Sequence, residues 1–192
     1  MSDRRTAAAV LGCNMSVFST IMPEDVEVET SPSGFMRGTR LMTPAGWRAV
    51  EDLVPGDVVA CCKGAAVRIT ARHPRMLIRS DAQVVAVSGE ARGLARRTES
   101  LLLPLDQMIV VAGDRLAAYF GVEEALAPIG ALVNGIDLRL VEAPGTELWI
   151  EIETDAPCAL VVEGLQVAVG DAARDSRPAL SEVDARLLAL AA

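Results

Sequence analysis

Side chains able to act as nucleophiles, general bases or soft metal ligands are few in this sequence. Histidine occurs once, at His73, so the chain by itself cannot assemble a zinc site of three histidines or of two cysteines and two histidines. The cysteines, Cys13, Cys61, Cys62 and Cys158, show no C-x-x-C spacing. Sequence neighbours rarely pair with each other, so we expect reduced thiols that serve mostly as small core residues. No metal or organic cofactor is expected.

Other polar groups also have the chemistry for a site. The Ser33 hydroxyl is a nucleophile, although its Ser-Pro-Ser-Gly context is typical of a loop. Glu147, Glu151 and Glu153 recur at even spacing, which places their carboxylates on one face of a strand. Such a set could bind calcium or act as an acid/base pair, but it is more typical of the solvent face of a half-buried strand. We interpret His73, which precedes Pro74, as a surface histidine at a strand end.

Composition restricts the kinds of partner. The chain has 192 residues with 18 basic and 26 acidic side chains, a net charge of −8, and only 3% aromatic residues. Such a charge repels phosphate backbones and anionic lipids, and base-stacking aromatics are scarce, so neither nucleic acid nor a membrane is expected as a partner. A protein or peptide partner remains. With no run of eighteen apolar residues and an apolar start of only residues 7–12, we expect a soluble cytoplasmic chain, with non-classical secretion left open.

The elements that must position these residues are mainly strands. Short β-branched runs separated by Gly, Pro and Asn predict strands at Val58–Ala60, Val67–Thr70, Val84–Val87, Met108–Val111, Leu148–Glu153 and Ala159–Val162. A short helix is predicted over Glu123–Val133. Another is predicted at residues 181–192, with Ser181 as N-cap and Val183, Leu187 and Leu188 as its apolar stripe. Strands without regular intervening helices favour an antiparallel all-β core.

Residues 34–59 are the most informative segment. Thr39–Met42 predicts a strand, Pro44-Ala45-Gly46 a turn, and the residues leading to Val50 a second strand. Pro55-Gly56-Asp57 then predicts a turn into a further strand. By itself this pattern indicates a β-meander and no chemistry.

The same segment resembles the opening block of the Hint (hedgehog/intein) domain family, which begins Cys-Phe-x-x-Gly-Thr-x-Ile-x-Thr-x-x-Gly and continues to Val-x-x-Leu-x-x-Gly-Asp-x-Val. Positions that match at the family's offsets are Phe35, Gly38, Thr39, Thr43, Gly46, Val50, Leu53, Gly56, Asp57 and Val58. Residues 120–135 and 149–165 resemble later blocks of the bacterial branch. The resemblance implies an all-β, horseshoe-shaped fold of antiparallel strands, to which the predicted C-terminal helix is added.

The resemblance also implies autoprocessing or protein splicing. In the family, the first cysteine attacks the carbonyl of the preceding residue, and histidines polarise or protonate that peptide bond. Here Gly34 stands at the nucleophile position. Asp106 and Pro157 stand where the bacterial branch has histidine. These departures predict a retained fold with a degenerate active site.

Three residues could replace the lost groups. Ser33 is one position out of register, and a displacement of about 1 Å already lowers rates about 100-fold. Cys158 falls in a strand expected beside the site, but the sequence reveals no cation to activate its thiol. Asp106 could act as a base only if there were an intermediate to attack, and it is more simply a loop-capping residue.

We therefore expect a lead-in at residues 1–33, a Hint-like domain at 34–170 and a tail with a short helix at 171–192. The expected function is that of a binding or structural module which has lost autoproteolysis and splicing. The alternative is an active autoprocessing domain that cleaves between Ser33 and Gly34 with an unorthodox nucleophile. An unrelated β-sandwich that binds a ligand is a third hypothesis, which requires the motif matches to be coincidental.

Overall fold

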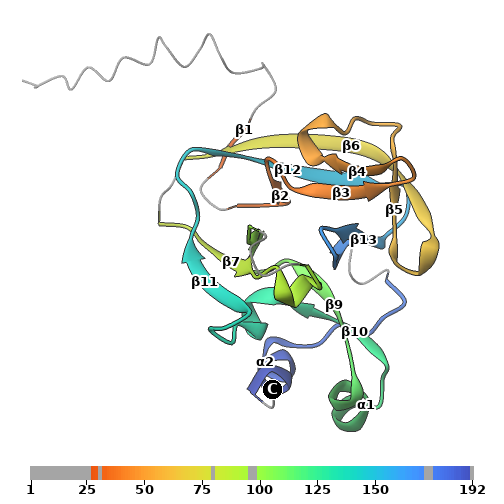
Figure 1. The fold of residues 1–192 in the computed structure, drawn as a ribbon, viewed down its shortest axis with the longest axis vertical. Coiled ribbons are helices and arrows are strands. Elements are labelled where there is room, and N and C mark those ends of the chain that lie inside the picture. The colour runs from red at the N-terminus through yellow and green to blue at the C-terminus, as the bar shows by residue number, and fades with distance from the viewer. Residues whose placement is uncertain (1–26, 30–31, 79–80, 95–98, 171–174, 191–192) are drawn as a thin grey trace, which may run out of the picture.

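The computed structural model describes residues 27–29, 32–78, 81–94, 99–170 and 175–190. These residues form short strands arranged in three sheets, joined by tight turns and 3₁₀ helices (Figure 1). β1 (Glu27–Glu29) pairs in parallel with β6 (Ala66–Leu77), and the other pairings between described strands are antiparallel. The predicted all-β, antiparallel fold class is thus confirmed.

The first sheet is built around β12 (Glu147–Thr154). β12 pairs along most of its length with β6 and, on its other edge, with β2 (Phe35–Met36). β5 (Val58–Ala60) pairs with the first part of β6. These strands lie at the top of the view in Figure 1, with β1 beside β6.

Two further sheets complete the fold. The six-stranded sheet has the order β10-β9-β14-β13-β3-β4, and the three-stranded sheet has the order β11-β7-β8. The bounds of the first set are β10 Glu124–Pro128, β9 Met108–Ala112, β14 Leu165–Val169, β13 Cys158–Val162, β3 Arg40–Thr43 and β4 Gly46–Ala49. The bounds of the second set are β11 Leu138–Glu142, β7 Gln83–Val87 and β8 Leu101–Pro104.

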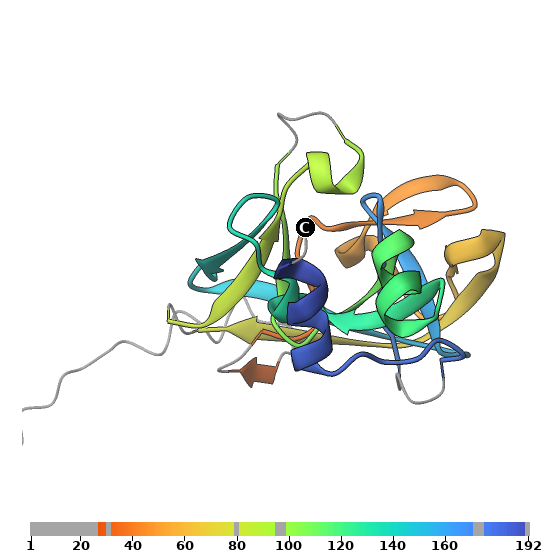
Figure 2. The same cartoon turned by 90° about the horizontal axis from the view of Figure 1, so that it is seen from below.

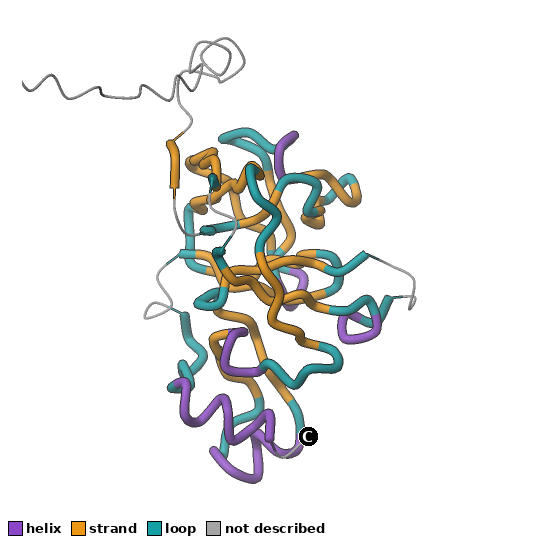
Figure 3. Tube along the Cα trace, turned by 90° about the vertical axis from the view of Figure 1, so that its left-hand side faces the viewer, coloured by secondary structure: helices purple, strands orange, loops and turns teal. Residues whose placement is uncertain are grey.

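The α-helices are short and lie away from the first sheet. α1 (Asp114–Phe120) and α2 (Glu182–Leu190) lie at the opposite end of the molecule, as Figures 1 and 3 show, and Figure 2 views that end directly. The 3₁₀ helices are η2 Val50–Asp52, η3 Cys62–Gly64, η4 Glu90–Arg92 and η5 Ile129–Leu132. Within the described ranges, no helix combines the length and apolarity needed to cross a bilayer.

A single large aliphatic core joins the sheets. Phe35, Leu41, Ile69, Ile150 and Leu160, which come from both larger sheets, are each buried to within 1% exposure and pack in one cluster. A smaller cluster surrounds the fully buried Trp149 between the first sheet and the three-stranded sheet. With so few aromatic residues, close packing of branched aliphatic side chains has to supply most of the hydrophobic stabilisation.

The strand predictions agree with the structure, since the six β-branched runs lie within β5, β6, β7, β9, β12 or β13, and the strand predicted at Thr39–Met42 overlaps β3. The predicted helix at Glu123–Val133 is wrong. That segment forms β10 and η5, because Ala125, Leu126 and Ala127 are all buried and pair with β9. Pairing along β9 outweighs the helix propensity of Ala and Leu. The predicted strand end at Pro74 is also wrong, because β6 continues through Pro74, which pairs opposite Ile150.

The C-terminal helix is confirmed, but its expected apolar stripe is not. Ser181 acts as the N-cap, since its Oγ accepts a hydrogen bond from the Asp184 backbone N–H at 3.2 Å. Val183 and Leu187 are 68% and 57% exposed, whereas the fully buried residue of α2 is Ala185. The helix lies close to η5 and β10, and a small side chain on its inner face permits this approach.

A buried arginine ties the three-stranded sheet to the β13–β14 turn. The Arg92 side chain is fully buried, and its Nη1 lies 2.6 Å from Glu163 Oε2. The same guanidinium donates to the backbone carbonyls of Ser88, Glu163 and Glu99. A buried charge is tolerated when its donors are satisfied in this way.

We predict that Arg92→Met lowers the free energy of unfolding by about 3–5 kcal/mol, because it leaves the Glu163 carboxylate without its buried partner. Chemical denaturation measures this value. Arg40→Met is the matched control, since Arg40 also faces Glu163, at 3.7 Å, but its side chain is 52% exposed. That change should lower the free energy by less than about 1 kcal/mol. Equal effects of the two variants would contradict the role assigned to Arg92.

Candidate functional site

The site is built around Gly34, at the start of β2. Its φ of +74° lies in the left-handed region, which favours glycine over residues with a side chain. The backbone here runs directly against β12. A Cβ at position 34 would overlap the Ile150 carbonyl oxygen and lie 2.7 Å from Glu151 Cα. This position therefore has no room for a side chain of any kind in the present arrangement of β2 and β12.

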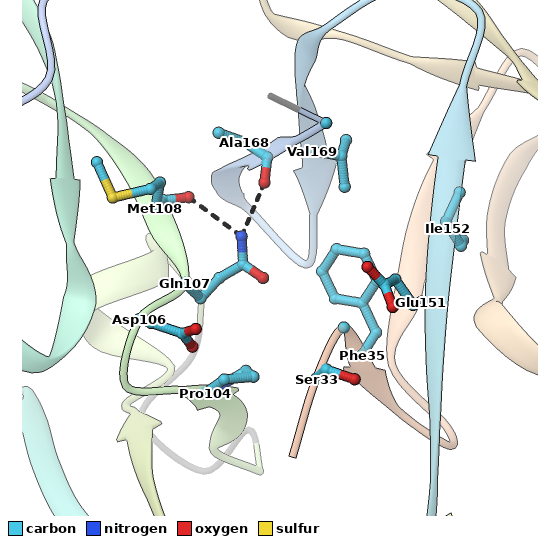
Figure 4. A pocket seen from close by; sticks show the side chains of 12 residues that line it. Ser33, Phe35, Pro104, Asp106, Gln107, Met108, Glu151, Ile152, Ala168 and Val169 are labelled. Carbon is cyan, nitrogen blue, oxygen red and sulfur yellow. Dashed lines mark hydrogen bonds between the residues drawn. The ribbon is translucent and has the colours of Figure 1, made fainter. Parts of the chain in front are cut away.

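A pocket of about 240 Å³ opens beside Gly34. Its walls come from the β2 entry, the β8–β9 turn, β12 and the end of β14 (Figure 4). The lining residues are Ser33, Gly34, Phe35, Pro104, Asp106, Gln107, Met108, Glu151, Ile152, Ala168, Val169 and Gly170. The structure thus brings together four residues that the sequence singled out, from three separate segments: Ser33, Gly34, Asp106 and Glu151.

Gln107 holds the β8–β9 turn against β14. Its side-chain Nε2 donates to the Ala168 carbonyl oxygen at 2.7 Å and to the Met108 carbonyl oxygen at 3.4 Å (Figure 4). Both amide protons are therefore directed at backbone carbonyls, and Oε1 is left as an acceptor toward the pocket. Gln107 was not among the candidates predicted from the sequence. Its place next to Asp106, which stands at a family histidine position, was the available signal.

The charged groups of the pocket lining are carboxylates. Asp106 is exposed on the β8–β9 turn. Glu151 is half-exposed, and its Oε2 lies 3.4 Å from Arg75 Nε. No lysine, arginine or histidine belongs to the described lining, so the pocket presents mainly hydrogen-bond acceptors. Such a surface suits donors such as peptide N–H groups or ammonium and guanidinium groups.

Two other candidate residues lie outside the pocket. Pro157 is in the β12–β13 turn, behind Gly170, where a Cβ on Gly170 would lie 3.6 Å from Pro157 Cα. Cys158 begins β13 and packs against the main core. Its thiol interacts with Thr154 Oγ1 at 3.9 Å and with the Cys61 thiol. The structure therefore groups Cys158 with another cysteine and not with Ser33, Gly34 and Asp106.

Burial keeps the Cys158 thiol protonated. Desolvation, together with its hydrogen bond to Cys61, raises the pKa of Cys158 from 9.0 to about 12. Because the thiolate is the nucleophilic form, Cys158 is a poor nucleophile at neutral pH.

His73 and the β12 carboxylates form surface ion pairs. His73 Nε2 lies 3.2 Å from Glu153 Oε1, and both side chains are substantially exposed. The face that Glu147, Glu151 and Glu153 share is only partly solvated, because Trp149 on the same face is fully buried. Among the described residues, no group of three or more His, Cys, Asp or Glu side chains is arranged to hold a metal ion.

The sequence profile of the Hint domain matches residues 33–168, which is more than half of the chain. The chain belongs to the Hint domain family. The match begins one residue before Gly34 and ends within β14, so the pocket walls lie almost entirely inside the Hint domain. Among curated proteins, none matches this sequence.

Solved structures with similar folds are inteins and intein-like domains. The bacterial intein-like domain from Clostridium thermocellum has 12% identity and a TM-score of 0.46, covering 72% of this chain and 99% of that one. The MchDnaB-1 intein has 15% identity and a TM-score of 0.42, covering 71% and 100%. The Msm DnaB1 intein splicing domain, solved with bound zinc, has 15% identity and a TM-score of 0.40, also covering 71% and 100%. No residue role in this Hint domain follows from these likenesses.

We predict that Gly34→Ala destabilises the Hint domain more than Gly38→Ala does. Both glycines have positive φ values, +74° and +86°, so both changes carry the strain of a left-handed alanine, about 1–2 kcal/mol. A Cβ at Gly38 meets nothing within 4 Å, whereas a Cβ at Gly34 overlaps β12. The overlap should add about 1–3 kcal/mol. Urea unfolding of both variants measures the difference, and equal values would show that β12 does not restrict position 34.

Proposed function

We propose that this Hint domain does not cleave or splice its own backbone and serves as a binding or structural module, with the pocket beside Gly34 as a site for a protein or peptide segment. The observation that carries the proposal is the close packing of the Gly34 backbone against β12. By resemblance to the family, residue 34 is the position from which the first nucleophile attacks. A glycine there supplies no nucleophile, and the surrounding backbone leaves no space for one.

The rest of the pocket supports the same proposal. The family's reaction needs an imidazole to polarise or protonate the scissile bond, which accelerates such steps about 10²–10⁴-fold. Asp106 and Pro157 stand at the positions that resemble the family's histidines, and neither supplies an imidazole. The hydroxyl of Ser33 is the remaining alcohol or thiol on the described lining. An acyl shift on that hydroxyl would act on the carbonyl of Pro32, one bond before the family's position.

The pocket has features suited to holding a peptide. The lining offers acceptors from Asp106, Gln107 and Glu151 next to the apolar faces of Ile152 and Val169. Because polar groups make up most of the exposed lining, hydrogen bonds would supply most of the specificity for a bound segment.

The loss of self-cleavage predicts a single species of full-length mass, 20.3 kDa, when the purified chain is incubated for days with thiol or hydroxylamine. Intact-mass spectrometry checks this. A break between residues 33 and 34, or between 32 and 33, would refute the inactive state. In that case, loss of the break in Ser33→Ala or Asp106→Ala would identify the replacement group and support the alternative of an active autoprocessing domain.

The binding role predicts that a random peptide library selected on the full chain yields binders that depend on the pocket. Asp106→Arg reverses the charge of an exposed pocket residue and should weaken these peptides at least tenfold in titration calorimetry. Asp114→Arg, an exposed Asp at the start of α1 and outside the pocket lining, is the matched control and should leave affinity unchanged. Binders equally affected by both variants, or by neither, would count against the pocket as the site.

A further inference from the structure

The three described cysteines lie outside the pocket, in the region where β5 and η3 approach β13. Cys61 follows β5 and forms an antiparallel bridge with Leu160 of β13. Cys158 lies two residues before Leu160 on the same strand, so both side chains of β13 point to the same face. The bridge therefore places Cys61 diagonally opposite Cys158 on this face, and the described cysteines are all free thiols.

The third cysteine faces a different partner. Arg177 Nη2 donates to Cys62 Sγ at 2.6 Å, while the same guanidinium pairs with Glu124 at 2.9 Å and Asp175 at 3.0 Å. This contact fixes the Cys62 side chain toward Arg177. Cys61, its neighbour, is 5% exposed and lies against the face of β13 that carries Cys158. The two adjacent thiols therefore have separate environments. Of the two, Cys61 is the one that lies near the Cys158 thiol.

We infer that Cys61 and Cys158 form an oxidative modification site, at which a low-molecular-weight disulfide such as oxidised glutathione converts the pair into a reversible intramolecular disulfide. The inference rests on the cysteine geometry and is independent of the proposed binding role. The sulfur atoms have to close to about 2.05 Å. The segment that has to move is η3, because it is a single 3₁₀ turn, whereas β13 is held between β3 and β14.

The reaction balances as two thiol–disulfide exchanges. The thiolate of Cys158, the more exposed of the pair, attacks one sulfur of the small disulfide and releases one small thiolate. The Cys61 thiolate then attacks the Cys158 sulfur of this mixed disulfide and releases the second small thiolate. Two protons leave the protein thiols and are taken up by the released thiolates. The protein is oxidised by two electrons, and the small disulfide is reduced to two thiols.

The environment of the pair sets the rate of this exchange. Burial raises the pKa of both thiols above 9.0, that of Cys158 to about 12, so the thiolate fraction is small at neutral pH. Below these pKa values, each pH unit increases the thiolate fraction tenfold, and the exchange should accelerate accordingly from about pH 7 to 9. The same high pKa values make both thiolates poor leaving groups, so the finished disulfide should be reduced slowly.

The test uses the full chain with Cys13→Ser and Cys62→Ser, which keeps the proposed pair intact. It is incubated with oxidised glutathione near pH 9 and digested with trypsin without reduction. Trypsin leaves Cys61 on peptide 49–63 and Cys158 on peptide 140–174. We expect these peptides to be joined, with a loss of about 2 Da from the intact mass. The link closes a loop of about 100 residues, so the melting temperature should rise by about 5–15 °C and fall back after reduction.

The matched control is the full chain with Cys13→Ser and Cys61→Ser, which retains Cys62 and Cys158. It should take up glutathione without joining the two peptides. A joined pair in this control, with none in the chain that carries Cys61 and Cys158, would assign the chemistry to Cys62 and overturn the inference. So would glutathione that remains bound at Cys158 without a second exchange.

Discussion

The fold depends on β12, which packs into a hydrophobic cluster on each face and has a partner strand on each edge. Its residues alternate between two hydrophobic clusters, with Trp149 in the smaller and Ile150 in the larger. Its edges pair with β6 and β2. The same strand supplies one wall of the pocket through Glu151 and closes the space beside Gly34. A shift of β12 by one residue would move Trp149 and Ile150 to each other's side of the sheet, and the same shift would remove the pocket wall.

The pocket is assembled from elements of different sheets, and this explains its mixed character. β2 and β12 belong to the first sheet, the β8–β9 turn bridges the other two, and β14 belongs to the six-stranded sheet. Gln107 joins the β8–β9 turn to β14 by hydrogen bonds to backbone carbonyls. These bonds position two walls of the pocket without any catalytic side chain. A Hint domain can in this way keep a defined concave surface whether or not it keeps the chemistry of its family.

The sequence predicts more of the fold than of the site. Runs of β-branched residues and turn signals locate most strands, and motif offsets bring Ser33, Gly34 and Asp106 to one place. Local patterns fail where pairing with a distant strand decides the outcome, as in β10, which has helix-forming residues but pairs along β9. The contact between Cys62 and Arg177 spans 115 positions, so no local pattern could have revealed a cation beside that thiol.

The contact at Gly34 also has an evolutionary consequence. β12 occupies the volume that a Cβ at residue 34 would need. A cysteine introduced at residue 34 would therefore first produce a packing defect, since β12 would have to retract before the thiol could reach any substrate. The substitution is epistatic with the position of Ile150 and Glu151. Descent through an intermediate with this packing defect is disfavoured, so the packing opposes the evolution of a nucleophile at residue 34.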